Sequence, residues 1–291
     1  MPSLLAPAKI NATLEILSRR EDGYHNLRSV MLPIALYDRI ELEPGSGFVA
    51  TDPALAENNL VARALEAAGL ADRVSAALHK AIPVGGGLGG GSSDAAAVLA
   101  AAMRGDLGPC EPRDWLDAAR RLGSDVPFFL VDTGALVEGI GERVTAIGVL
   151  PPWWVVVVRP HVAVPTAVAY RMLAEARASG ADRPGTRPRS ESVSLRAVDA
   201  LQRSDFAAFE ASLQNDFHAP VLAAYPEVAA AAAVMTAAGA PRVLLSGSGS
   251  CLFAAFESEA EARALDAALA GRGDVIAARF AVALHHGATW R

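Results

Sequence analysis

Residues 83–94 read PVGGGLGGGSSD, a run that contains six glycines. The residues before it, 73–84, alternate in the manner of a strand, and those after it, 95–103, are strong helix formers. A strand that runs through consecutive glycines into a helix brings unobstructed backbone N–H groups to the partly positive N-terminus of that helix. The stretch therefore predicts a phosphate-binding loop between a strand and a helix of one domain.

The loop ends with two serines, either of which can cap the helix or contact a phosphate or its metal ion. It lacks the Gly-Lys-Ser/Thr ending of a Walker A motif, and its spacing does not fit the dinucleotide fingerprint. A flexible glycine linker is the plain alternative, but linkers are seldom embedded between a strand and a helix of one compact domain. The expected nucleotide-binding residues are Pro83, Val84, Gly85, Gly86, Gly87, Leu88, Gly89, Gly90, Gly91, Ser92 and Ser93.

Composition narrows the class of protein. The 291 residues are 52% hydrophobic and 20% charged, enough for one large core or two modest ones. A net charge of −6 argues against nucleic-acid binding, because that needs a clustered basic surface. Cys110 and Cys251 lack His or Cys neighbours at metal-ligand spacing and are expected to be reduced thiols. The apolar stretch at residues 1–8 is too short for a signal peptide, and the apolar run 153–158 is too short to span a membrane. A cytoplasmic protein is therefore expected.

Two domains are expected, 1–150 and 151–291, because Pro151-Pro152 stiffens the chain and cannot continue a helix. In the first domain, apolar and polar residues alternate over 5–17 and 27–42, as in half-buried strands, with a turn at Asp22-Gly23. The remaining predicted elements of this domain are strands 73–84, 134–137 and 144–147 and helices 60–68, 95–103 and 113–122.

The second half has strands and helices in mixed order, which indicates the α+β class. Residues 179–192 are rich in Gly, Pro, Arg and Ser without apolar periodicity, and predict a mobile loop. The predicted elements are strands 153–158, 242–246, 251–256 and 275–282 and helices 165–178, 195–202, 205–213, 228–238 and 259–269.

Four ordered motifs resemble those of the GHMP kinases, named for galactokinase, homoserine kinase, mevalonate kinase and phosphomevalonate kinase. PVGGGLGGGSS at 83–93 resembles their phosphate loop. Three further motifs are similar to members that phosphorylate a cytidine diphosphate alcohol in non-mevalonate isoprenoid biosynthesis. These are PAKIN at 7–11 followed by DGYH at 22–25, LGSDVPFF at 122–129 and SGSGS at 246–250. The likeness spans the chain, strongly to about Gly141 and thinly afterwards, and residues 179–192 match nothing in it.

The resemblance implies an α+β, two-domain GHMP kinase fold, with an N-terminal domain like the second domain of ribosomal protein S5 and a ferredoxin-like C-terminal domain. The active site would lie in the cleft between them. By itself, an Asp after a helix is usually a surface turn residue, and a Lys in an apolar strand often extends to water. The resemblance implies instead that Asp125 is the general base and that Lys9, close to it, keeps it ionised and stabilises negative charge. Asn11 shares a strand face with Lys9 and is expected to orient the substrate hydroxyl.

The resemblance also implies that the substrate's cytosine lies between the rings of Tyr24 and Tyr170, with His25 bonding the base edge. Ordinary half-buried packing is the alternative for each tyrosine. A glycine pair can equally make a tight turn, and an asparagine can equally cap a helix. Further expected contacts are Thr166, Gly247 and Gly249 for the substrate and Asn59 and Leu60 for adenine.

The implied function is ATP-dependent phosphorylation of a hydroxyl on a cytidine diphosphate alcohol, with Mg²⁺ bridging the nucleotide phosphates and its protein ligands left open. One alternative is another GHMP kinase, acting on a mevalonate derivative, homoserine or a sugar, although such a substrate gives no reason for an aromatic clamp. The other is a nucleotide-binding regulator without catalysis, against which Lys9 and Asp125 count. The expected partner is this small molecule, not a nucleic acid or a membrane, bound by a monomer or homodimer.

Overall fold

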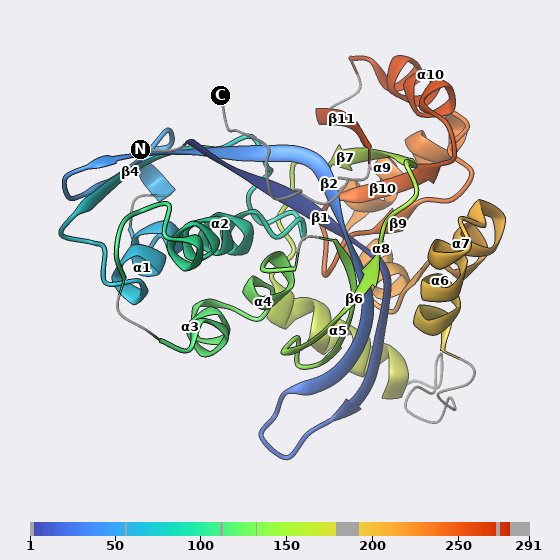
Figure 1. The fold of residues 1–291 in the computed structure, drawn as a ribbon. Coiled ribbons are helices and arrows are strands. Elements are labelled where there is room, and N and C mark those ends of the chain that lie inside the picture. Colours follow the sequence, from blue (N-terminus) through green and yellow to red (C-terminus); the bar gives the residue numbers. More distant parts are fainter. Residues whose placement is uncertain are drawn as a thin grey trace.

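The computed structural model describes residues 3–55, 57–110, 113–131, 133–178, 192–271 and 274–279. Within these ranges the chain forms two β-sheets with helices packed against them, which confirms the α+β class (Figure 1). The elements are β1 (Ser3–Arg19), β2 (His25–Pro44), β3 (Phe48–Ala50), the 3-10 helix η1 (Pro53–Leu55), α1 (Leu60–Ala67), β4 (Val74–His79), α2 (Gly90–Arg104), α3 (Trp115–Leu122), α4 (Val126–Phe129), β5 (Gly134–Gly139), β6 (Arg143–Gly148), β7 (Trp154–Arg159), α5 (Thr166–Ala178), α6 (Val193–Gln202), α7 (Phe206–Ser212), β8 (Gln214–Asn215), α8 (His218–Ala224), α9 (Pro226–Ala237), β9 (Leu244–Leu245), β10 (Leu252–Phe256), α10 (Glu259–Leu269) and β11 (Asp274–Arg279).

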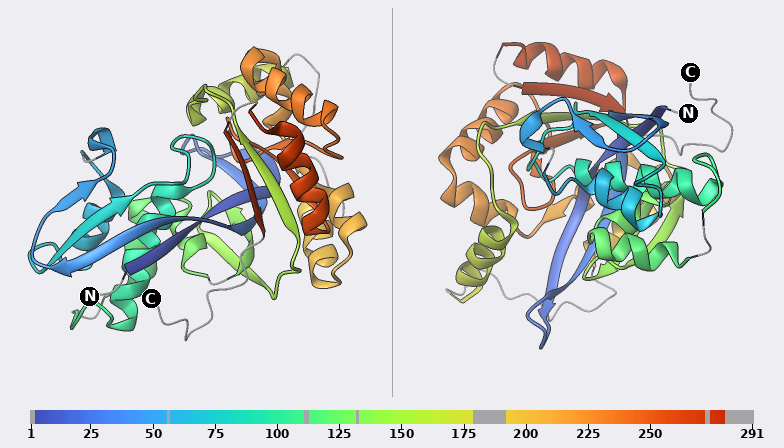
Figure 2. Two further views of the ribbon diagram at one scale, coloured as in Figure 1. Left: turned by 90° about the horizontal axis from the view of Figure 1, so that it is seen from above. Right: turned by 90° about the vertical axis from the view of Figure 1, so that its left-hand side faces the viewer.

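The first sheet is built on a long antiparallel hairpin of β1 and β2, drawn in blue in Figure 1. Ser3 lies opposite Glu41 at one end, and Arg19 lies opposite His25 beside the predicted turn. Described strands follow the order β3-β4-β2-β1-β8, while β5 pairs with β2 and β6 with β5. Figure 2 shows the second sheet, with β7 in yellow-green and its later strands and helices in orange and red, gathered on one side of this hairpin.

The strand β1 is more buried than its alternating sequence predicts. Every residue from Ala8 to Ile16 is buried, including the polar ones, because helices α2 and α6 both pack against the strand. The prediction of a half-buried strand is therefore wrong over this stretch. Polar side chains that would otherwise face water must find hydrogen-bond partners inside the protein.

The strand before the glycine-rich loop and the helix after it have different ends from those predicted. β4 stops at His79, because the next backbone N–H groups, those of Ala81 and Ile82, donate to the side chain of Asp38. Helix α2 begins at Gly90, five residues earlier than predicted. Its N-cap is Gly89, with a φ of 71°, so neither serine of the loop caps the helix.

The second sheet has the order β11-β7-β10-β9 within the described chain. Its strand β7 is buried on both faces, which explains the uninterrupted run of valines at 155–158. Val155 and Val157 join a core with Ile10 of β1, whereas Val156 and Val158 join a second core against α8, α9 and α10. The first of these cores therefore contains residues from both halves of the chain.

A short strand from the second half, β8, pairs in parallel with β1 at Thr13 and Leu14. The division at Pro151-Pro152 into domains 1–150 and 151–291 stays a prediction. Two short helices, α4 and α8, were not expected, and β9 covers only Leu244–Leu245 of the predicted strand 242–246. Residues 179–191, most of the predicted mobile loop, and 280–282 of the last predicted strand lie outside the described residues.

In the described part of the chain, no single helix has the length and apolar composition needed to cross a membrane. Helices α8 and α9 meet that requirement only when taken as a pair, and they are bent by 115° at the break between them. Both cysteines are free, as predicted.

Candidate active site

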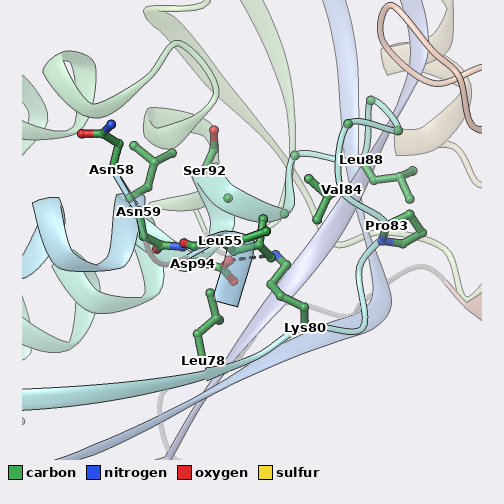
Figure 3. Close-up of a pocket in the computed structure, with 18 of the residues that line it drawn as sticks. Leu55, Asn58, Asn59, Leu78, Lys80, Pro83, Val84, Leu88, Ser92 and Asp94 are labelled. Atoms are coloured by element: carbon green, nitrogen blue, oxygen red, sulfur yellow. Dashed lines mark hydrogen bonds and ion pairs between the residues drawn. The ribbon is translucent and has the colours of Figure 1, made fainter. Parts of the chain in front are cut away.

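A cavity of about 400 Å³ lies between the glycine-rich loop and the start of α1 (Figure 3). Its walls include every residue of the predicted phosphate loop from Pro83 to Ser92, together with Asn59 and Leu60. Ser93 is not among them, because its side chain is buried behind the first turn of α2. The other lining residues are Ala54, Leu55, Glu57, Asn58, Leu78, Lys80 and Asp94.

Asn59 caps α1 and lines the cavity at the same time. Its side-chain oxygen accepts from the N–H of Val61 at 2.9 Å, and its amide nitrogen donates to the carbonyl of Leu55 at 2.8 Å. The position of Asn59 is therefore compatible with both roles predicted from the sequence, the helix cap and the wall of the nucleotide pocket.

The glycine-rich loop is held by backbone contacts with two distant segments. The N–H of Lys9 donates to the carbonyl of Leu88 at 2.9 Å, and the N–H of Cys251 donates to the carbonyl of Gly86 at 3.1 Å. The hydroxyl of Ser246 donates to the carbonyl of Gly87 at 2.9 Å. Strand β1 and the late glycine loop 246–250 thus approach the phosphate loop from both sides.

Two positions show why these loops need glycine. A Cβ on Gly87 would lie 2.0 Å from the carbonyl oxygen of Ser246, closer than any real Cβ contact. A Cβ on Gly247 would lie 3.3 Å from the carbonyl oxygen of Gly87 and 3.4 Å from Oδ1 of Asn11. The late loop is also the predicted tight turn between β9 and β10, and the amide of Asn215 holds it by donating to the carbonyl of Gly247 at 2.7 Å.

Lys9 and Asp125, which are 116 positions apart, meet beside the loop. The Nζ of Lys9 lies 3.5 Å from Oδ2 of Asp125 and 2.5 Å from Oδ1 of Asn11. The lysine side chain is 4% exposed and the aspartate side chain 27% exposed, so the carboxylate can reach a ligand while the cation is shielded. A Cβ on Gly89 would contact both Lys9 and Phe129 at about 3.1 Å, so strand, loop and α4 converge here.

Asp125 lies at the N-cap position of α4 but makes no capping hydrogen bond with its side chain. The carboxylate is therefore not needed to hold the helix end. With its carboxylate 3.5 Å from the ammonium group of Lys9 and partly exposed, it has the position expected of a proton acceptor.

An ionic cluster on the cavity floor was missed by sequence reasoning. Lys80 contacts Oδ2 of Asp38 and lies 2.8 Å from Oδ2 of Asp94, and both carboxylates are buried. Figure 3 shows the contact between Lys80 and Asp94. Asp38 also accepts hydrogen bonds from the N–H groups of Ala81 and Ile82, at 2.6 and 2.9 Å. The signal that could have revealed it is a charged residue, Asp38, in the middle of an apolar strand.

Asp94 is the member of this cluster whose pKa is raised. Its Oδ1 is buried and has no hydrogen-bond partner. Burial raises the pKa of Asp94 to about 7, although the charge of Lys80 acts in the opposite direction. Asp38 has the more complete set of donors, so burial is less fully compensated at Asp94 than at Asp38.

This shift predicts a pH-dependent stability. Because the folded-state pKa is above the unfolded value of about 4, the stabilisation is present at low pH and is lost as the pH rises through about 7. The free energy of unfolding of the wild type, measured relative to Asp94→Asn in urea, should fall by on the order of 1 kcal/mol or more between pH 5 and 8. An exposed control, Asp106→Asn, should show no such trend, and equal trends for the two variants would contradict this assignment.

The aromatic residues lie at the turn end of the β1–β2 hairpin and on α5. Tyr24 is 62% exposed beside the β1–β2 turn. The ring of Tyr170 stacks on His25 with centroids 4.7 Å apart and meets Phe217 edge-on at 4.9 Å. One face of Tyr170 is therefore covered by His25, an arrangement that the sequence did not predict.

Two shifted pKa values describe this end of the site. Burial, then the charges of Arg19 and Arg177, lowers the pKa of His25, so its imidazole is neutral at pH 7. Burial, then the negative charge of Asp125, raises the pKa of Tyr170. At the start of α5, the hydroxyl of Thr166 lies 3.0 Å from that of Ser248 in the late glycine loop.

Residues 57–133 match the family described as GHMP kinases N terminal domain, and residues 197–275 match GHMP kinases C terminal. The fold is that of a GHMP kinase, and the chain is an ATP-dependent small-molecule kinase. Proteins named 4-diphosphocytidyl-2-C-methyl-D-erythritol kinase are 42% identical over 251 residues in Symbiobacterium thermophilum and 40% identical over 273 residues in Thermus thermophilus. The chain belongs to the family of 4-diphosphocytidyl-2-C-methyl-D-erythritol kinases.

The match to the Symbiobacterium relative covers 83% of this chain and 86% of that protein. The match to the Thermus relative covers 92% of this chain and 93% of that protein. A crystal structure titled 4-(cytidine 5'-diphospho)-2C-methyl-D-erythritol kinase matches with a TM-score of 0.77 at 39% identity, over 95% of this chain and 98% of that one. A crystal structure of a homoserine kinase from Cytophaga hutchinsonii matches with a TM-score of 0.66 at 20% identity. This match covers 97% of this chain and 95% of that one and shows a shared fold. The GHMP fold implied by the sequence motifs is thereby confirmed.

Proposed function

We propose that this chain transfers the γ-phosphoryl group of ATP to the 2-hydroxyl of 4-diphosphocytidyl-2-C-methyl-D-erythritol, a step of non-mevalonate isoprenoid biosynthesis. The observation that carries the proposal is the 3.5 Å approach of Lys9 to Asp125 directly beside the glycine-rich loop. The substrate follows from the name of relatives about 40% identical over most of the chain.

In this proposal Asp125 accepts the proton of the substrate hydroxyl as the oxygen attacks the γ-phosphorus. Lys9 keeps the carboxylate ionised before the reaction and neutralises charge on the transferred group. Asn11, bonded to Lys9 through its Oδ1, orients the hydroxyl and the lysine together. The rate gain comes from this positioning and from the electrostatic environment, since phosphoryl transfer needs no covalent help from the protein.

The nucleotide would occupy the 400 Å³ cavity. Backbone N–H groups of the loop 83–92 and the N-terminus of α2 would hold the phosphates, and Asn59 and Leu60 would line the adenine site. The set of phosphate contacts leaves out the side chain of Ser93, because it is buried and does not line the cavity.

The residues present fit a magnesium ion held mainly by the nucleotide. Among the described residues, no group of three or more His, Cys, Asp or Glu could hold a metal by itself. Mg²⁺ commonly keeps several waters and uses few protein ligands beside substrate phosphates. Ser92 would contact it, since this serine belongs to the phosphate loop and lines the cavity. When bound, the ion neutralises charge on the β- and γ-phosphates.

The cytidine part of the substrate would bind at the aromatic end of the site. Tyr24 offers an exposed ring, and the second ring, Tyr170, becomes available when His25 moves off its face and bonds the base edge. Thr166, Gly247 and Gly249 would contact the remainder of the substrate. The proposal also includes a cytoplasmic location, where ATP is made available, and action as a monomer or homodimer.

The aromatic contact can be tested at Tyr24. Tyr24→Ala should raise KM for the cytidine substrate by about five-fold or more, because stacking on a base is worth about 1 to 3 kcal/mol, while KM for ATP stays within about two-fold. Tyr24→Phe keeps the ring and should behave as the wild type in steady-state kinetics. Small and equal changes in both KM values for Tyr24→Ala would argue against the clamp.

A further inference from the structure

Strand β1 contains a bulge next to the proposed catalytic residues. Asn11 lies opposite Met31, whereas Thr13 lies opposite Val30, so one residue of β1 is extra at this point. Directly opposed residues share a face, and successive residues of a strand point to opposite faces. The bulge therefore places Thr13 on the opposite face of the sheet from Asn11.

The two faces have different neighbours. Lys9, opposite Pro33, shares the face of Asn11 and points to the active site. Glu15, opposite Arg28, shares the face of Thr13. That second face is covered by α6, whose residues join the same core as Val30. The polar residues at positions 9, 11, 13 and 15 are thus divided between two sides of the sheet.

Hydrogen bonds connect the two sides through the bulge. The amide nitrogen of Asn11 donates to Oγ of Ser29 at 2.8 Å, and Ser29 donates to the carbonyl of Thr13 at 2.6 Å. The N–H of Val30 donates to Oγ1 of Thr13 at 2.9 Å. Two side-chain hydroxyls therefore replace the ladder bonds that the bulge interrupts.

On the other side of the sheet, this series of hydrogen bonds continues to the start of α6. Oγ1 of Thr13 lies 2.8 Å from Oγ of Ser194, which donates to Oε2 of Glu15 at 2.7 Å. Ser192 donates to the same carboxylate oxygen at 2.5 Å. Thr13 and Ser194 are 0% exposed and Glu15 is 5% exposed, so water does not compete for these bonds. We call Asn11, Ser29, Thr13, Ser194 and Glu15 the through-sheet chain.

The hydrogen bonds of the through-sheet chain can have only one set of donors and acceptors. A serine or threonine hydroxyl has a single proton, and a carboxylate only accepts. Ser194 donates to Glu15, so it accepts from Thr13, and Ser29 donates to a carbonyl, so it accepts from the amide of Asn11. The amide of Asn11 must then turn its oxygen toward Lys9, as the 2.5 Å contact shows.

We propose that the through-sheet chain holds Asn11, and through it Lys9, in the orientation needed for phosphoryl transfer, and that Thr13 is a positioning residue of the enzyme. The inference rests on the proposed function for the role of Lys9. Loss of the Thr13 hydroxyl removes the acceptor of the Val30 N–H and the contact with Ser194, which keeps only its bonds on the side of Glu15. The bulge two residues from Asn11 thereby loses its side-chain support. Small displacements of a positioned group lower the rate of transfer more than the binding of substrates.

The matched pair Thr13→Val and Thr13→Ser tests this. Valine keeps the shape and removes the hydroxyl, while serine keeps the hydroxyl. Steady-state kinetics on the folded enzyme should show kcat about ten-fold lower for Thr13→Val, with both KM values within about two-fold, and kcat within about two-fold of the wild type for Thr13→Ser. A purely structural role would lower the melting temperature of Thr13→Val but leave kcat per folded molecule unchanged, which would overturn the proposal.

Ser194→Ala provides a second test if Thr13→Val does not fold. Its control is Ser212→Ala, a serine equally buried whose hydroxyl donates to the carbonyl of Phe209 at 2.6 Å away from the site. A kcat lowered several-fold by Ser194→Ala and unchanged by Ser212→Ala supports the chain. Equal kcat values for the two variants would contradict it.

The activity of the wild type shows whether a negative result contradicts the positioning role or the proposed function on which it rests. If the wild type does not phosphorylate 4-diphosphocytidyl-2-C-methyl-D-erythritol, the proposed function is wrong, and the variants are compared on the acceptor that the wild type does use. If the wild type is active and Thr13→Val matches Thr13→Ser, only the positioning role is wrong.

Discussion

Replacing Asp125 by asparagine should lower kcat by about 100-fold or more while the Kd for ATP stays within about two-fold. The change keeps the size of the side chain but removes the group that accepts the substrate proton, and general-base catalysis is worth about 10²- to 10⁴-fold. ATP binding should be retained because Asp125 does not line the nucleotide cavity. Steady-state kinetics and calorimetric titration with ATP measure the two quantities.

Asp106→Asn is the matched control, since its carboxylate lies at the surface beside Arg104 and away from the cavity. It should leave both kcat and the Kd for ATP unchanged. Urea unfolding of Asp125→Asn shows whether the loss of the partner of buried Lys9 also destabilises the fold. Turnover within about ten-fold of the wild type, in a folded Asp125→Asn protein, would remove this residue from the role of base.

Replacing Gly87 by alanine should damage both stability and nucleotide binding. The new methyl group would lie 2.0 Å from the carbonyl oxygen of Ser246, a backbone atom that cannot move aside cheaply. A positive φ of 77° adds strain of about 1 to 3 kcal/mol for a residue other than glycine. We expect a loss of roughly 3 kcal/mol or more in the free energy of unfolding and an increase of about ten-fold or more in the Kd for ATP.

Gly105→Ala separates the clash from the backbone strain. Gly105 has a φ of 79°, almost that of Gly87, and a Cβ there would meet nothing within 4 Å. This control should lose only about 1 to 2 kcal/mol and bind ATP as the wild type does. The close approach of the two loops would be contradicted if Gly87→Ala and Gly105→Ala gave the same unfolding curve and the same Kd.

Features that depend on local chemistry were predictable from the sequence. A run of glycines between a strand and a helix requires a specific backbone, so the phosphate loop could be located without knowing what it contacts. The cap at Asn59 and helix α10, with its capping box at Ser258, are local in the same way. The motifs around Lys9 and Asp125 placed both residues in one site because the resemblance supplied the long-range contact that spacing cannot.

Features that depend on packing between distant segments were not predictable. Lys80 lies near Asp38 only because β2 and β4 are neighbours in the sheet, and the sequence separation of 42 residues carries no sign of it. The alternation of polar residues along β1 predicted one polar face, but the bulge after Asn11 divides them between two buried faces. The stacking of His25 on Tyr170 likewise joins a hairpin end to a helix from the other half of the chain.

The central claim is that the chain phosphorylates a cytidine diphosphate alcohol. A coupled assay of ADP release with 4-diphosphocytidyl-2-C-methyl-D-erythritol, mevalonate, homoserine and galactose as acceptors tests it most directly. We expect rapid ADP release with the cytidine compound and none above background with the other three. Release with one of the other acceptors in preference to the cytidine compound, or with none of the four, would contradict it.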